Sequence, residues 1–320
     1  MLATLTSLPE PVLDLRDLLN TDLEPEKVAI VLRAFEVGAE AHHGQTRKTG
    51  EPYIFHPIAV ARILANMRMD YGSVAAAILH DTIEDTPLTR EEIESRFGEE
   101  IADLVEGVTK LDKMKFRTRH EADAESFRKL MLAMSKDLRV IFIKLADRMH
   151  NMRTLGSMNP KSRRRIARET LDIYAPIADR LGMNSIKSEL QDLGFANLYP
   201  WRHRTIAEHI STVTGDRSEI IADIHKALKR KMNEAGIPCD IKGREKTPYS
   251  IYRKMLAKDL SFSEVNDVYG FRIITHSEPH CYLALGAIHG LYRPKPGRFK
   301  DHIALPKANG YQSLHTTLNS

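Results

Sequence analysis

Residues 75–85 read A-A-A-I-L-H-D-T-I-E-D, a short apolar run that ends on His80 and Asp81. The small and apolar residues before this pair predict a buried helix, and Glu84 and Asp85 follow one helical turn later. A His-Asp pair alone more often belongs to a core in which a partly buried histidine meets a carboxylate. The pair indicates a functional site only if further ligand-type residues accompany it.

Two such residues occur elsewhere in the chain. His56 precedes the run, and Asp147 follows it within A-D-R-M-H-N, residues 146–151. Two imidazoles with two carboxylates suit a divalent cation of the manganese, iron and zinc range, whereas an all-oxygen set would suggest magnesium or calcium. His150 is a rival ligand, but Asp147 lies among apolar residues, where a charged carboxylate needs a partner such as a metal. The first hypothesis is therefore a metal-dependent hydrolase.

Neighbouring side chains suit water activation and phosphate binding. Glu84 and Asp85 would orient or deprotonate a water at the metal. Arg47 and Lys48, in R-K-T-G, would hold phosphate by charge and bidentate hydrogen bonds, although a plain surface loop of this composition would mean little. One helical face would also present a carboxylate, an amide and a hydroxyl in a row. They belong to Asp147, Asn151 and Thr154, which follow the i, i+4, i+7 spacing.

Composition predicts a cytoplasmic protein with two domains. The 320 residues carry 47 Lys+Arg and 43 Asp+Glu, a net charge of +4 that is too low for a dedicated nucleic-acid binder, so no direct nucleic-acid binding is expected. Cys239 and Cys281 lack the spacing of a disulfide framework or a zinc-thiolate site, which favours a reducing compartment. No run of about 18 apolar residues indicates a membrane helix.

A helical pattern extends from Pro25 to about residue 200. The expected features are a helix from Pro25 with Val28, Leu32, Phe35 and Ala39 on one face, a helix after Pro57, an N-cap at Ser73, a capping box at Thr89 and Glu92, and a buried helix from Asp137 to Leu155. The highly charged residues 111–125 fit a mobile lid or, equally, a solvated helix face.

The residues after about 205 predict an α+β region. We expect a helix from Ser218 to Asn233, a β-rich run from Val268 to Ile274, and a helix from Cys281 to Leu291. Cations gather in G-R-E-K-T-P-Y-S-I-Y-R-K, residues 243–254. The segment would suit a polyphosphate, but composition alone slightly favours a charged, solvated turn and helix. Asp267, at the start of the strand, is a reasonable Mg2+ ligand.

Three segments resemble the HD-type hydrolase domain of RelA/SpoT stringent-response enzymes: R-K-T-G-E-P-Y-I-F-H-P (47–57), I-L-H-D-T-I-E-D-T (78–86) and K-L-A-D-R-M-H-N-M-R-T (144–154). The resemblance implies removal of the 3′-pyrophosphate from guanosine tetra- or pentaphosphate (ppGpp or pppGpp), giving GDP or GTP. It implies that Mn2+ binds His56, His80, Asp81 and Asp147, that Glu84 and Asp85 serve the attacking water, and that the nucleotide contacts Arg47, Lys48, Asn151 and Thr154.

The second part is similar to the synthetase domain of the same family, which makes (p)ppGpp from ATP and GDP or GTP. By that resemblance, ATP contacts Arg244, Lys246, Ser250 and Lys254, Mg2+ binds Asp267, guanine stacks on Tyr311, and the basic cleft is completed by Arg272, Lys307, Asn309 and His315. The family domain continues beyond Ser320 to a second acidic residue, so we expect an incomplete domain with weak or absent synthetase activity. R-F-K-D, residues 298–301, resembles bifunctional and hydrolase-dominant, SpoT-like members.

The expected fold class is thus α+β. An all-helical HD-type metal-dependent phosphohydrolase domain, residues 1–200 with connecting helices, precedes a truncated nucleotidyltransferase-like α/β synthetase domain, residues 201–320. Hydrolysis is the leading hypothesis. Pyrophosphokinase activity is the second, and a nucleotide-sensing regulatory role for residues 205–320 is the third.

Overall fold

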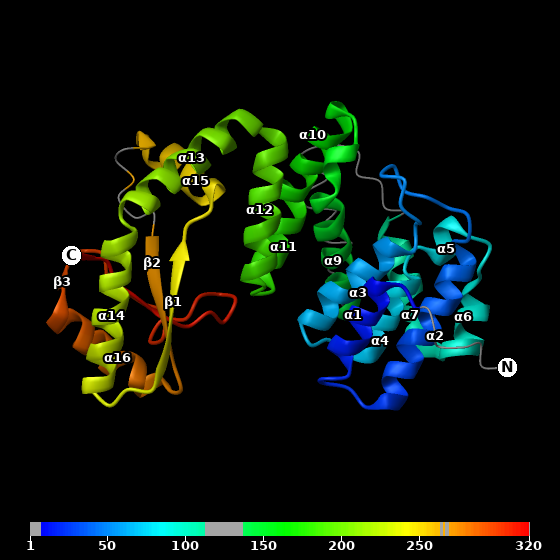
Figure 1. Ribbon diagram of the computed structural model, residues 1–320, viewed down its shortest axis with the longest axis horizontal. Helices are drawn as coiled ribbons and strands as arrows, with labels where there is room; N and C mark the ends of the chain where they lie inside the picture. The colour runs from blue at the N-terminus through cyan, green and yellow to red at the C-terminus, as the bar shows by residue number, and fades with distance from the viewer. Residues whose placement is uncertain (1–7, 113–136, 263–264, 266–268, 320) are drawn as a thin grey trace. The chain divides into compact units, whose positions relative to one another are not determined.

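The computed structural model describes residues 8–112, 137–262, 265 and 269–319 (Figure 1). The chain forms two compact units, Met1–Tyr174 and Ala175–Ser320. Asp267 and residues 113–125 of the predicted lid lie outside the described residues. The assignment of functions to residues 1–200 and 201–320 stays a prediction. The helices just before residue 200 pack against the helices that follow them, which places the division between units earlier in the chain.

The described part of the first unit is helical. Its elements are α1 (Glu10–Leu19), α2 (Pro25–Ala41), α3 (Phe55–Asn66), α4 (Tyr71–Leu79), α5 (Thr82–Asp85), α6 (Arg90–Phe97), α7 (Glu99–Asp112), α9 (Arg139–Arg153), the 3-10 turn η1 (Leu155–Ser157), α10 (Pro160–Glu169) and the π-helical turn η2 (Thr170–Tyr174). Helix α4 contacts α2, α3, α7 and α9, and its residues Gly72–Leu79 are buried. The predicted buried helix before His80 is therefore confirmed.

The structure confirms one predicted helix cap and corrects one cap and one helix face. The capping box at Thr89 and Glu92 begins α6 as predicted. Ser73 was expected to cap α4, but Asp70 is the N-cap, and it accepts hydrogen bonds from the Ser73 backbone N (3.0 Å) and hydroxyl (2.7 Å). The buried face of α2 differs from the predicted one. Leu32 and Ala39 are only half-buried, and the buried positions are Val28, Val31, Ala34, Phe35 and Gly38.

The second unit combines helices with short antiparallel strand pairs. Its elements are α11 (Ala175–Arg180), α12 (Asn184–Leu198), α13 (Pro200–Asp216), α14 (Ser218–Glu234), β1 (Cys239–Glu245), α15 (Pro248–Lys258), β2 (Tyr269–Thr275), α16 (Glu278–Leu291), β3 (Arg293–Pro294), β4 (Lys300–Asp301), β5 (Leu314–His315) and β6 (Leu318–Asn319). The predicted helix from Ser218, strand near 268–274 and helix ending at Leu291 are confirmed to within a few residues.

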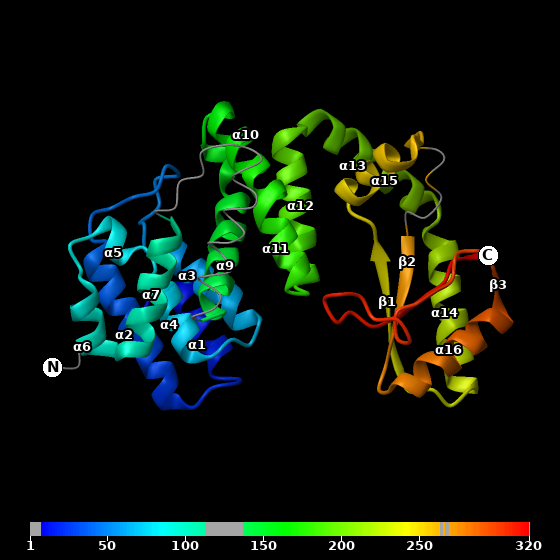
Figure 2. The ribbon, with the colours of Figure 1, turned by 180° about the vertical axis from the view of Figure 1, so that it is seen from behind.

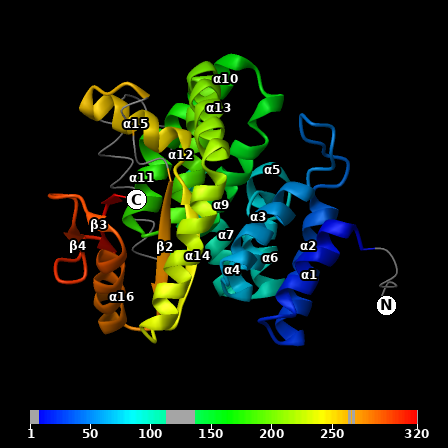
Figure 3. The same ribbon diagram turned by 60° about the vertical axis from the view of Figure 1, so that its left-hand side comes forward.

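Strands β1 and β2 form an antiparallel ladder with Lys242 opposite Arg272. The ladder lies against α14 (Figure 2) and α16 (Figure 3). Ile241, Phe271 and Ile273 pack into the buried cluster that these helices share, so the alternate positions, which include Lys242 and Arg272, are exposed. This alternation gathers cations on one face of the ladder. No described helix is long and apolar enough to span a membrane.

Candidate metal centre and active site

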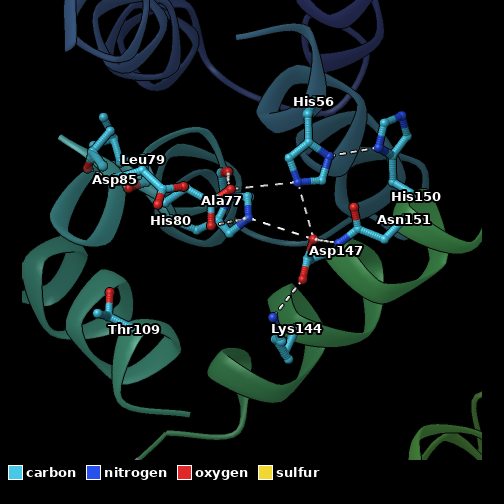
Figure 4. A network of polar contacts seen from close by, with 12 residues as sticks. His56, Ala77, Leu79, His80, Asp85, Thr109, Lys144, Asp147, His150 and Asn151 are labelled. Atoms are coloured by element: carbon cyan, nitrogen blue, oxygen red, sulfur yellow. Dashed lines mark hydrogen bonds and ion pairs between the residues drawn. The ribbon is translucent and has the colours of Figure 1, made fainter. Parts of the chain in front are cut away.

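Three separate elements bring the predicted metal ligands together. Helix α3 carries His56, the end of α4 carries His80 and Asp81, and α9 carries Asp147. Figure 4 shows both imidazoles directed toward Asp147. Ligand atoms of His56, His80 and Asp147 all lie within 4.8 Å of one another, and all three residues are buried. Asp81 lies beside them, with Oδ1 3.2 Å from His80 Nε2 and Oδ2 3.7 Å from His56 Nε2.

The hydrogen bonds of His80 leave one nitrogen available for a cation. Its Nδ1 donates to the Ala77 carbonyl oxygen at 2.8 Å, so the neutral ring carries its proton there and a lone pair on Nε2. Nε2 is buried and makes no hydrogen bond within the described part of the chain. It faces carboxylate oxygens of Asp81, at 3.2 Å, and Asp147, at 3.9 Å. A lone pair that faces carboxylates is unfavourable without a cation between them, so this donor set fits a divalent metal.

His56 is oriented in a similar way by His150. The two Nδ1 atoms are 2.7 Å apart, and Arg47 Nη1, which can only donate, is 3.3 Å from His150 Nδ1. His150 Nδ1 therefore accepts, His56 Nδ1 donates, and the lone pair on His56 Nε2 faces Asp147 Oδ1 at 3.2 Å. Burial lowers the pKa of His56 and lowers that of His150 to about 4. His150 therefore orients the His56 ring through its Nδ1, on the side of the ring away from Asp147.

Asp147 is held as a carboxylate by neighbours on its own helix. Its Oδ2 accepts a hydrogen bond from Lys144 Nζ at 2.7 Å, and its Oδ1 accepts one from Asn151 Nδ2 at 2.6 Å. Burial would raise the pKa of Asp147, but the Lys144 charge opposes it, and the pKa of Asp147 lies well below its usual range. Sequence reasoning missed Lys144, although its i−3 spacing from Asp147 was a readable signal. The buried charge of Asp147 thus has a partner besides a metal.

Only some of the predicted phosphate-binding residues lie close to one another. Arg47 Nη2 donates to Asn151 Oδ1 at 2.6 Å, which links the R-K-T-G segment to α9. Lys48 is exposed. Thr154 ends α9, and its hydroxyl donates to the His150 carbonyl oxygen at 3.1 Å. Arg47 and Asn151 therefore lie in direct contact beside the ligands, whereas Lys48 and Thr154 lie at the margins.

The predicted water-directing pair is exposed on the short helix α5. Asp85 Oδ2 lies 3.2 Å from the Tyr53 hydroxyl, which donates to Asp81 Oδ2 at 2.7 Å. Burial, followed by the charge of Asp81, raises the pKa of Tyr53, so the phenol stays protonated as a donor. Glu84 is exposed. Sequence reasoning did not single out Tyr53, although it lies in the 47–57 segment, because no sequence pattern shows that its hydroxyl reaches Asp81.

The predicted synthetase residues fall into two groups in the second unit. Arg244 and Arg272 line a pocket of about 510 Å³, together with Thr247 and one side of α12. The hydroxyl of Ser250 donates to the Thr247 carbonyl oxygen at 2.8 Å. Lys246 and Lys254 are half-buried on the neighbouring segments. The lining also includes Glu189 and Asp192, and Asp192 Oδ1 accepts a hydrogen bond from Tyr249 N, in the first turn of α15, at 3.4 Å. The pocket therefore combines two guanidinium groups with two carboxylates.

The second group surrounds Tyr311. The Tyr311 hydroxyl is 2.9 Å from His315 Nε2, and Lys307 Nζ lies 4.9 Å from the centre of the Tyr311 ring. The Asn309 side-chain amide donates to the Asp179 carbonyl oxygen at 3.0 Å. Burial lowers the pKa of His315. Tyr311, Lys307 and His315 therefore form one cluster of a phenol ring, an ammonium group and an imidazole. Purine binding by this cluster stays a prediction.

Comparisons with known proteins identify both regions. Residues 34–184 match the HD domain, and residues 243–320 match the region found in RelA / SpoT proteins. The bifunctional (p)ppGpp synthase/hydrolase SpoT of Escherichia coli K12 is 55% identical over 95% of this chain and 43% of its own length. A guanosine-3′,5′-bis(diphosphate) 3′-pyrophosphohydrolase of Vibrio cholerae is 52% identical over the same shares.

A GTP pyrophosphokinase of Myxococcus xanthus is 47% identical over 90% of this chain and 39% of its own length. The chain thus spans less than half the length of these curated relatives. The similarity to the Escherichia coli protein nevertheless extends over 304 residues of this chain. The chain therefore belongs to the RelA/SpoT family, and it carries an HD domain followed by the region found in RelA and SpoT proteins.

Proposed function

We propose that this chain is a Mn2+-dependent (p)ppGpp 3′-pyrophosphohydrolase. The observation that carries the proposal is the buried His80 Nε2, which makes no hydrogen bond to a described residue and faces two carboxylates. His56, His80, Asp81 and Asp147 would hold the metal, and their mixed nitrogen and oxygen donors favour Mn2+ over Mg2+ or Ca2+. The names of the relatives from Escherichia coli and Vibrio cholerae support the choice of substrate.

The residues around the ligands have distinct roles in this proposal. When bound, the metal supplies Lewis-acid stabilisation of phosphate charge and lowers the pKa of a nearby water. Lys144 and Asn151 keep Asp147 ionised and oriented. His150 and the Ala77 carbonyl oxygen fix the tautomers of His56 and His80, so both rings present a lone pair to the site.

The substrate and the water would meet on the exposed side of this centre. Arg47 and Lys48 would bind the negatively charged pyrophosphate, with Asn151 and Thr154 as hydrogen-bonding partners. Glu84 and Asp85, both exposed on α5, would accept the proton of the attacking water. Water then supplies the hydroxyl group to the released pyrophosphate and the hydrogen to the ribose 3′-oxygen, which leaves GDP from ppGpp or GTP from pppGpp.

The test is hydrolysis of ppGpp by the whole chain in Mn2+. We expect native protein to release pyrophosphate and GDP, and His80→Ala to lower kcat by at least 100-fold, because the substitution removes a ligand nitrogen. His43→Ala is a matched control, since this histidine is exposed and is not among the residues assigned to the site, and it should keep native activity. The absence of product with native protein, or undiminished product with His80→Ala, would reject the proposal.

A second candidate function is nucleotide binding or synthesis in the second unit. The pocket lined by Arg244 and Arg272 favours it, because the two guanidinium groups can bind the phosphates of ATP, while Glu189 and Asp192 line the same pocket. The cluster at Tyr311 suits the guanine of GDP or GTP. AMP formed from ATP and GDP, and abolished by Asp267→Ala, would establish a Mg2+-dependent synthetase. Calorimetric binding of GDP without AMP would establish a regulatory site.

A further inference from the structure

The hydroxyl of Tyr53 lies between two carboxylates that have different proposed roles. Its oxygen is 2.7 Å from Asp81 Oδ2 and 3.2 Å from Asp85 Oδ2. Asp81 is a proposed metal ligand, and Asp85 is a proposed acceptor of the water proton. Two carboxylates that approach one point repel each other unless a donor lies between them. The Tyr53 hydroxyl supplies that donor.

The ring of Tyr53 is fixed by a buried histidine. His42 stacks on it with ring centres 4.6 Å apart and an interplanar angle of 28°. His42 is itself 3% exposed, and its Nδ1 is 2.9 Å from Gln45 Oε1. The phenol therefore has little freedom to turn away from the two carboxylates.

The backbone around Tyr53 ties the same residues together. The Tyr53 N donates to the Gln45 carbonyl oxygen at 3.0 Å, and the Gln45 side-chain amide donates to the Asp85 carbonyl oxygen at 3.0 Å. The Tyr53 carbonyl oxygen accepts from His56 N at 2.9 Å, at the start of α3. These hydrogen bonds thus connect Asp85, through both its side chain and its backbone, to the turn that precedes His56.

We propose that Tyr53 is a positioning residue of the hydrolase site, which fixes the metal ligand Asp81 and the water-directing Asp85 relative to each other. This role rests on the proposed hydrolase function and adds a residue that the ligand pattern does not include. Hydrogen-bond donors that orient a ligating carboxylate tune metal affinity. If the hydroxyl were merely structural, its removal would alter stability and leave metal affinity unchanged.

The test is Tyr53→Phe, which keeps the stacked ring and removes only the hydroxyl. Calorimetric titration of the metal-free whole chain with Mn2+ should show affinity about 10- to 100-fold weaker than native. The thermal midpoint of the metal-free variant should stay near that of native protein, because the ring and its packing remain. At saturating Mn2+, kcat for ppGpp should still be reduced with KM unchanged, since the hydroxyl shared by Asp81 and Asp85 no longer holds Asp85 in place.

Tyr282→Phe is the matched control. Its hydroxyl also donates to a carboxylate, Asp301 Oδ2 at 3.0 Å, but in the second unit, so native Mn2+ affinity is expected. Native Mn2+ affinity and native kcat in Tyr53→Phe would overturn the positioning role while leaving hydrolysis intact. Native protein that binds no Mn2+ would instead overturn the proposed function, so the two failures are distinguishable.

Discussion

At the scale of single residues, the site depends on how its buried charges are compensated. Asp147 is 3% exposed and Lys144 is 8% exposed, and their side chains meet at 2.7 Å. Removing one partner of such a pair leaves the other charge buried, which is far more costly than losing a surface pair. Lys144 therefore stabilises the metal-free protein and keeps Asp147 ionised for a cation.

Lys144→Met should accordingly destabilise the metal-free chain. We expect the free energy of unfolding at neutral pH, measured by urea denaturation, to fall by about 3 kcal/mol. Lys110→Met, which removes an exposed i, i+4 pair with Glu106 at 2.8 Å, should cost less than about 1 kcal/mol. Equal losses for the two variants would show that Asp147 does not depend on Lys144.

Residue types and spacing predicted the ligands, but they did not predict the side chains that support them. His56, His80 and Asp147 are residues of the few types that bind metals, so composition and a short motif were enough to select them. Tyr53 reaches Asp81 across 28 positions in sequence, through a turn whose path no local pattern specifies. Its role became visible only when the elements were packed together.

At the scale of elements, helix α4 depends on a cap that joins it to α9. Asp70 caps α4 and also accepts from Arg139 Nη1 at 3.2 Å, while Asp137 accepts from Arg139 Nη2 at 2.6 Å. Partial burial would raise the pKa of Asp70, but the Ser73 and Arg139 contacts lower it overall. The Arg139 hydrogen bonds lower the pKa of Asp137. The elements that carry His80 and Asp147 thus share one ion-paired junction.

This junction predicts a specific pH dependence. A carboxyl group whose folded pKa is depressed stabilises the protein above its unfolded pKa, about 3.9, and loses that contribution as pH falls through the folded value. Asp70→Asn should therefore cost about 1 kcal/mol at pH 7 and progressively less below about pH 4. Urea denaturation at pH 7 and pH 3 measures the difference, and an equal cost at both pH values would contradict it.

The presence of a helix was easier to predict than its N-cap or its buried face. The apolar run before His80 and the capping box at Thr89 are local signals, and both gave correct helices. The N-cap of α4 was misplaced, because Asp70 and Ser73 are both good capping residues. The hydrogen bonds from Ser73 and the contact with Arg139 favour the aspartate. The rotated face of α2 has a similar cause, since its burial is set by packing on α4.

At the scale of the whole molecule, the chain carries two chemically different sites in separate compact units. The first unit holds the buried histidine and carboxylate centre, and the second holds a pocket lined by arginines and carboxylates and a separate cluster around Tyr311. The resemblance to one family predicted both, because each site has its own run of characteristic residues. The limits of the units were not predictable from sequence, since they depend on how the helices between the two sites pack.

The most direct measurement of the central claim is the rate of pyrophosphate release from ppGpp by metal-free protein before and after addition of Mn2+. The proposed site predicts a rate near background without metal, and a rise of at least 100-fold when about one equivalent of Mn2+ is bound, because His56, His80 and Asp147 then share a cation. The same rate with and without Mn2+ would contradict the proposed metal-dependent hydrolase.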